Sequence, residues 1–168
     1  MAKNIFQDIL KGKIVFVGIG NTLRSDDGLG PAIIERLKNH TAAVCIDAGS
    51  APENHSGKII KEKPDTVILI DAAHLGLETG QYRILKNEEI ANSGFTTHNI
   101  SPKLFIEYLQ SRIKADIYLL AIQPENISFG EELSEPVKKA VGEVSRLIIE
   151  ATKEKPKTYH QDTKAQKH

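Results

Sequence analysis

The segment that sets the architecture reads IVFVGIGNTLRSDDGLGP and spans residues 14–31. It begins as a short apolar run rich in β-branched residues, passes through a glycine-rich turn, and ends where Gly30-Pro31 opens a helical pattern. Proline is well placed there, because the first turn of a helix leaves its N–H groups unpaired in any case. A buried strand, a loop and a helix in this order predict an α/β fold.

The same alternation continues along the chain. Similar apolar runs occupy residues 43–46, 66–70 and 117–122, and a shorter, more polar run at 82–85 is typical of an edge strand. Strands that are apolar on both faces belong to parallel sheets covered by helices on both sides. These runs therefore predict a mostly parallel, five-stranded sheet flanked by helices on both faces.

Two further helices have readable starts. Ser101 is the predicted N-cap of one, and Ser134 caps another that carries Pro136 in its first turn. The predicted buried stripe of the helix after Ser101 consists of Leu104, Phe105, Tyr108 and Leu109. A weak amphipathic turn near residues 5–10 precedes the first strand.

The character of the chain changes after Ala151, where aliphatic residues almost disappear and lysine becomes frequent. Such a segment cannot bury enough apolar surface to offset the entropy of ordering. We predict a single domain over residues 1–151 and a disordered basic tail over residues 152–168.

Composition excludes several classes of protein. The 168 residues contain 22 Lys+Arg against 22 Asp+Glu, so the formal net charge is zero, which disfavours a nucleic-acid binder or a polybasic membrane-surface protein. One cysteine, Cys45, allows neither an internal disulfide nor a cysteine-based zinc site, and its place in a predicted strand favours a small buried apolar role. With no membrane span or signal peptide evident, we expect a cytoplasmic monomer.

Acidic residues follow the predicted strands, at the edge where parallel sheets place their functional crevice. Asp27, Asp47 and Asp71 come after the first three runs, and His98 precedes the Ser101 helix. Carboxylates gathered at one edge repel each other unless a cation compensates. Asp27, Asp71 and His98 form a two-oxygen, one-nitrogen set that suits nickel or zinc. Helix caps or loop turns remain open as roles for the two aspartates, as does a hydrogen-bonded surface role for His98.

Other chemistry is weakly indicated. The glycine turn lacks the third glycine of a dinucleotide fingerprint and the lysine of a phosphate-binding loop. His74 follows Asp71 closely and is interpreted as a group supporting the site or as a helix-start residue. The loop of residues 50–55 is a candidate for substrate selectivity.

Several motifs, taken in order, carry a family resemblance. They are the glycine turn with Asn21 and Asp26-Asp27-Gly28, DAGSAPEN at residues 47–54, Ile70-Asp71-Ala72, TTHN at residues 96–99, and Gln123-Pro124. From about residue 13 to residue 149 the chain resembles the hydrogenase maturation endopeptidases. The resemblance is to the subgroup that processes the large subunit of nickel-iron hydrogenase of the formate-hydrogenlyase type.

The resemblance implies a three-layer α/β sandwich with a twisted five-stranded sheet. It also implies an activity, the removal of a C-terminal extension from the hydrogenase large-subunit precursor once nickel has been inserted. The metal arrives with the substrate, and the ligand positions carry over as Asp27, Asp71 and His98. The family motif after the second strand often reads Asp-Gly-Gly, whereas here Ala48 replaces the first glycine.

Two versions of the chemistry stay open. Nickel could act as a Lewis acid on the scissile carbonyl or on a bound water, or Asp47 could be the catalytic general base for water. Two other classes of protein also fit the acidic edge. One is a non-proteolytic nickel-binding maturation factor, and the other is a receiver-like phosphoacceptor domain, although no lysine follows the last strand.

Overall fold

The computed structural model describes residues 3–86, 88–91 and 101–166, with side chains for all of these except 88, 91 and 154–166. The elements in chain order are α1 (Ile5–Ile9), β1 (Ile14–Ile19), the 3₁₀ turn η1 (Ser25–Gly28), α2 (Leu29–Leu37), β2 (Val44–Gly49), the 3₁₀ turn η2 (Pro52–His55), α3 (Ser56–Glu62), β3 (Thr66–Ala72), β4 (Tyr82–Lys86), α4 (Glu88–Ala91), α5 (Pro102–Arg112), β5 (Asp116–Ile122) and α6 (Glu135–Gln166).

The five strands form one sheet in the order β2-β1-β3-β5-β4. The first four of these are parallel, and β4 runs antiparallel to β5 at the edge. The predicted mostly parallel five-stranded sheet with a polar edge strand is therefore confirmed. The order and the antiparallel edge differ from the receiver-type order 2-1-3-4-5, so the receiver interpretation is wrong.

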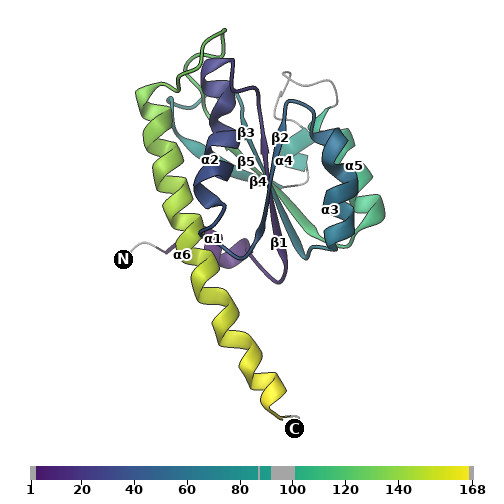
Figure 1. Ribbon diagram of the computed structural model, residues 1–168. Helices are drawn as coiled ribbons and strands as arrows, with labels where there is room; N and C mark the ends of the chain where they lie inside the picture. Colours follow the sequence, from purple (N-terminus) through teal and green to yellow (C-terminus); the bar gives the residue numbers. More distant parts are fainter. Residues whose placement is uncertain (1–2, 87, 92–100, 167–168) are drawn as a thin grey trace.

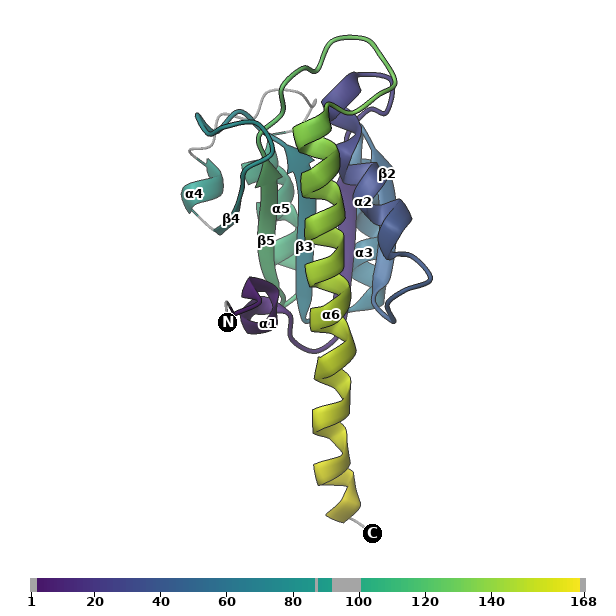
Figure 2. The ribbon, with the colours of Figure 1, turned by 90° about the vertical axis from the view of Figure 1, so that its left-hand side faces the viewer.

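Helices cover both faces of the sheet, which gives three layers (Figures 1 and 2). On one face, α1, α2 and α6 enclose a core that includes Phe6, Phe16 and Val144. On the other face, α3, α4 and α5 enclose a second core that includes Ile59, Leu69 and Phe105. The alternation of side chains along each strand divides the strand residues between the two cores.

Helix α2 lies unusually close to β1. A Cβ at Gly30 would stand 2.4 Å from the Ile19 carbonyl oxygen and 2.6 Å from that of Ile70, and a Cβ at Gly18 would stand 2.5 Å from the Gly30 oxygen. Only glycine permits this approach. It brings the start of α2, and the turn η1 before it, down onto the carboxyl ends of β1 and β3.

Ser101 caps α5 as predicted, because its Oγ accepts a hydrogen bond from the Leu104 N–H at 3.1 Å. The predicted buried stripe is only half correct. Phe105 and Leu109 are buried, whereas Leu104 is 56% exposed and Tyr108 is 42% exposed. The short α5 needs only a narrow apolar seam to cover its face of the sheet, so the outer two side chains remain in water.

Helix α6 starts beside Ser134 as predicted and continues to Gln166, through residues for which the sequence predicts disorder. Figure 1 shows that its last turns project beyond the sheet. The segment contains good helix formers such as lysine, glutamine and alanine, but also Pro156 and three threonines, so helix propensity alone does not account for the continuation. The predicted end of the packed domain at residue 151 stays a prediction. Within the described ranges, no helix has the length and apolarity needed to cross a bilayer.

Candidate functional site

Four loops meet at one edge of the sheet, because the parallel strands that precede them all end there. They follow β1, β2, β3 and β5. Backbone hydrogen bonds join them, from the Gly20 N–H to the Gly49 oxygen at 2.8 Å and from the Ala73 N–H to the Ile122 oxygen at 3.0 Å. The strand order reverses between β1 and β3, since β2 lies beyond one of them and β5 beyond the other. This reversal is where open α/β sheets bind ligands.

The glycine turn after β1 folds back tightly on itself. Gly20 has a φ of +145°, and a Cβ there would collide with the Asp27 carbonyl oxygen. The turn then continues through η1 directly into α2, so Asp26 and Asp27 lie at the N-terminal end of a helix. The positive end of the helix dipole favours negative charge at this position. The glycine turn thus carries Asp26 and Asp27 to the edge of the sheet.

Asp26 is a structural carboxylate. Its side chain is fully buried and accepts hydrogen bonds from the N–H groups of Glu125, Asn126 and Ser134 and from the Ser134 hydroxyl, at 2.7–3.2 Å. These bonds fix the long loop after β5 and the start of α6 onto the glycine turn. The sequence feature related to this role is Ser134, which by itself predicts only a helix cap.

Asp27 differs from its neighbour in one respect that matters chemically. It is 2% exposed, and its Oδ2 accepts a hydrogen bond from the Asn21 N–H at 2.9 Å. Its Oδ1 is buried and has no hydrogen-bond partner among the described residues. A buried carboxylate oxygen without a partner is costly, so it is a strong candidate for a group that binds a cation in the functional complex.

Asp71 lies near the end of β3 and is 2% exposed. Its Oδ1 accepts a hydrogen bond from the Ala72 N–H at 2.8 Å. Strands β1 and β3 are adjacent, and η1 packs against β3. Asp27 and Asp71 therefore belong to the two segments that border the reversal of strand order, as the predicted ligand set requires.

His98, the third predicted ligand, lies outside the described residues. In the ranges that the structure describes, no group of three histidine, cysteine or acidic side chains is arranged to hold a metal ion. The predicted set of Asp27, Asp71 and His98 therefore stays a prediction.

Asp47 occupies a different position. It lies on β2, paired in register with Gly18, and is exposed. Its neighbours Ile46 and Ala48 face the core under α3 and α5, so alternation directs Asp47 to the opposite face, whereas Asp71 lies on the same face as Ala121 in the α5-side core. The Asp47 Oδ1 accepts a hydrogen bond from the Gly49 N–H at 3.1 Å, which shapes the turn. This geometry supports Asp47 as a turn residue better than as a general base beside Asp71.

Ala48 fits the turn after β2 without strain. The residue that adopts a positive φ is Gly49, at +58°, while Ala48 is buried in the core. The replacement of the first glycine of the family motif therefore leaves the backbone of this loop intact.

Gln123 organises the loop after β3. Its Oε1 accepts hydrogen bonds from the N–H groups of Leu75 at 2.6 Å and Leu77 at 3.3 Å, and its Nε2 lies 3.4 Å from the Nδ1 of His74. His74 is exposed and does not begin a helix. The interpretation of His74 as a helix-start residue is wrong, and its contact with Gln123 gives it a fixed place at the edge.

Glu53 is a candidate that the sequence reveals only as part of the 50–55 loop. It lies in η2, directly after β2, and its Oε1 is buried without a hydrogen-bond partner in the described part of the chain. Neither hydrophobic periodicity nor residue spacing identifies Glu53 in the sequence, because only the missing hydrogen-bond partner of its Oε1 among the described residues sets it apart.

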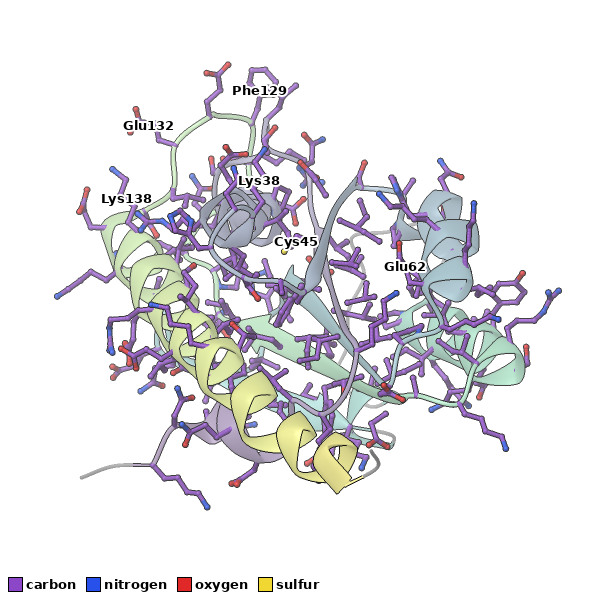
Figure 3. The ribbon with its side chains drawn as sticks, turned by 60° about the horizontal axis from the view of Figure 1, so that its bottom comes forward. Lys38, Cys45, Glu62, Phe129, Glu132 and Lys138 are labelled. Atoms are coloured by element: carbon purple, nitrogen blue, oxygen red, sulfur yellow. The ribbon has the colours of Figure 1, made fainter. Side chains whose placement is uncertain are left out.

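Cys45 is half-buried and packs against the core on the α2 side (Figure 3). Burial raises the pKa of its thiol to about 11. Nucleophilic catalysis requires a thiolate, so the prediction that Cys45 is an apolar packing residue and no nucleophile agrees with its surroundings.

Comparisons with known proteins agree with this geometry. A family model described as hydrogenase maturation protease matches residues 31–151. Hydrogenase 3 maturation protease of Escherichia coli K12 is 35% identical over 137 residues, which cover 80% of this chain and 87% of that protein.

Solved structures give the same result. The crystal structure of the NiFe hydrogenase maturation protease HycI from Thermococcus kodakarensis has a TM-score of 0.81 and 34% identity, and the match covers 89% of this chain and 99% of that one. The solution structure of the endopeptidase HycI from Escherichia coli has a TM-score of 0.73 and 33% identity, with coverage of 80% and 88%. The chain belongs to the hydrogenase maturation protease family. It is an endopeptidase of the HycI type.

Proposed function

We propose that this endopeptidase removes the C-terminal extension of a nickel-iron hydrogenase large-subunit precursor after nickel has been inserted. In this proposal Asp27, Asp71 and His98 complete the coordination of a nickel ion that the precursor holds and delivers as part of the substrate. The observation that carries the proposal is the buried Asp27 Oδ1 beside the reversal of strand order, which has no hydrogen-bond partner among the residues that the structure describes.

The donor set supports nickel brought by another protein. Two carboxylates and an imidazole leave coordination positions open, and thiolates are ligands that nickel accepts. The chain has one cysteine, and Cys45 has a raised pKa inside the fold. Thiolate ligands must therefore come from the precursor, so the ion would join the two proteins only after metal insertion.

In this arrangement nickel would be the recognition signal and would supply Lewis acidity at the scissile carbonyl or at a water. The residues of this chain hold the ion and so position the bond to be cut. Asp27 contributes a carboxylate that is already dehydrated and fixed at one oxygen by the Asn21 N–H, so little reorganisation is needed on binding. The predictions of a cytoplasmic location and of a monomer stay predictions.

Isosteric variants test the ligand roles. Asp27→Asn and Asp71→Asn are expected to lower the rate of precursor cleavage about 100-fold or more, because each removes the charge that binds the ion. Asp116→Asn is the matched control, since this exposed aspartate lies at the opposite end of the sheet, where β5 begins. The readout is mass spectrometry of the precursor C-terminus. Normal cleavage by the Asp27→Asn variant would contradict the proposal.

Two further outcomes separate the alternatives. If Asp47 is the general base, Asp47→Asn will bind the precursor normally and fail to cut it, while a normal rate removes Asp47 from the chemistry. If the protein only carried nickel, the wild type would leave the mass of the precursor unchanged.

A further inference from the structure

Phe129 is the most exposed large apolar side chain in the described part of the chain. It is 85% exposed, whereas Phe6, Phe16 and Phe105 are at most 2% exposed. Figure 3 shows it at the tip of the loop between β5 and α6, pointing away from the body of the molecule. Leu23, on the glycine turn, is 47% exposed. We call these two side chains the Leu23–Phe129 patch.

The two parts of the patch are joined by the backbone. The Gly130 N–H donates to the Leu23 oxygen at 2.8 Å, and the Ser25 N–H donates to the Gly130 oxygen at 2.6 Å. The Ser25 hydroxyl donates to the Ser128 oxygen at 2.9 Å. Phe129 is thus held between anchored neighbours, and its exposure is a fixed feature of the loop. A loop fixed in this way loses little conformational entropy when it binds.

The patch adjoins the proposed metal site. Leu23 lies four positions before Asp27 on the same turn, and the loop that carries Phe129 is anchored by the buried Asp26. A protein that brings an ion to Asp27 therefore comes within reach of the Leu23–Phe129 patch.

The charge around the patch is mainly negative, with Arg24 as the cation beside it, whose Nε donates a hydrogen bond to the Ile127 oxygen at 3.1 Å. Residues 123–134 contain three glutamates, Glu125, Glu131 and Glu132, and no lysine or arginine. All three are exposed. A complementary surface presents an apolar depression edged by lysine or arginine side chains.

We infer that the Leu23–Phe129 patch docks onto the hydrogenase large-subunit precursor, at an apolar depression with a basic rim, and so contributes to choosing the substrate. This inference rests on the proposed function. It adds a contact outside the metal site, by which the enzyme distinguishes its own precursor from other proteins that present a nickel ion.

The test compares Phe129→Ala with Tyr108→Ala, which truncates another exposed aromatic ring, on α5. We expect Phe129→Ala to raise the KM for nickel-loaded precursor about tenfold, with kcat near that of the wild type, because buried aromatic anchors dominate interfaces. Tyr108→Ala should leave both constants unchanged, and both variants should keep the wild-type Tm. A wild-type KM for Phe129→Ala would overturn the inference while leaving the proposed function intact.

Two more arms complete the experiment. Changing Glu131 and Glu132 together to glutamine should raise KM and weaken its dependence on salt, and an unchanged salt dependence would contradict the basic rim. Sedimentation of the free enzyme tests whether the Leu23–Phe129 patch binds a second copy of this chain instead. A wild-type dimer that the Phe129→Ala variant fails to form would overturn the inference. A wild-type enzyme that leaves nickel-loaded precursor uncut would overturn the proposed function and this inference with it.

Discussion

At the scale of single residues, two adjacent aspartates with the same chemistry have opposite roles. Asp26 accepts four hydrogen bonds from the loop after β5, while Asp27 accepts one and keeps a buried oxygen without a partner in the described structure. Buried groups that are left unsatisfied in a native fold are typical of functional positions. Stability and function are therefore divided between neighbouring side chains.

This division predicts different losses for the two residues. Asp26→Ala should lower the free energy of unfolding by about 3 kcal/mol, because it leaves several donors at the start of α6 without their acceptor. Asp27→Asn should change it by no more than about 1 kcal/mol, since it removes a poorly satisfied buried charge and can keep the bond from Asn21. Urea unfolding of the two variants measures both values. Equal destabilisation would contradict the assignment of separate roles.

Cys45 gives a prediction about pH. With the pKa of the folded thiol at about 11 against 9.0 as the reference value, alkylation at pH 8 should be about 100-fold slower in the folded protein than in urea. Because burial disfavours the thiolate, the thiol does not change the stability of the folded state below pH 9, and the folded state loses stability as the pH rises from 9 toward 11. The rate of iodoacetamide modification, followed by mass, measures the first effect. A native rate equal to the unfolded rate would show that the thiol is not protected.

The sequence identifies the acidic edge but not the state of each group in it. The positions of Asp27 and Asp71 at this edge were predictable, because the carboxyl ends of parallel strands meet at one edge of the sheet. The face on which Asp47 lies depends on the alternation along β2 and on the bulge after it. That the Oε1 of Glu53 has no partner among the described residues depends on what surrounds it in the fold. Spacing along a chain contains neither kind of information.

At the scale of elements, the strands were easier to predict than the helices. The strands are apolar on both faces, and the edge strand β4 is marked by its polar residues. The short α3 and α4 have too few turns to show a periodic pattern, so the sequence does not reveal them. Their place follows from the need to cover the second face of the sheet, which is a tertiary requirement.

The close approach of α2 to β1 predicts a contrast between two helical glycines. Gly30→Ala should lower the free energy of unfolding by about 3 kcal/mol, because its Cβ meets backbone oxygens of both β1 and β3. Gly142→Ala, in α6, should raise it by about 0.5 kcal/mol, because its Cβ would make only an ordinary contact, 3.9 Å from the Arg36 Nη1, and alanine favours the helix. Thermal unfolding of both variants checks this contrast. A stable Gly30→Ala variant would show that the approach is not tight.

At the scale of the whole molecule, the net charge of zero conceals an uneven distribution. Residues 152–168 hold five lysines against Glu154 and Asp162, so the tail is basic and residues 1–151 are mildly acidic. The acidity includes the carboxylates at the functional edge, and residues 152–166 continue α6 away from that edge (Figure 2). The total charge does not reveal this distribution, because only the fold separates the two ends.

The central claim is that the nickel ion of the precursor completes the site. If so, the enzyme should not cleave a precursor that lacks the metal. The measurement is cleavage by the purified enzyme of nickel-loaded and nickel-free precursor, side by side, with the C-terminus followed by mass spectrometry. Trimming of the nickel-loaded precursor alone is the predicted result. Equal trimming of both forms would contradict the claim.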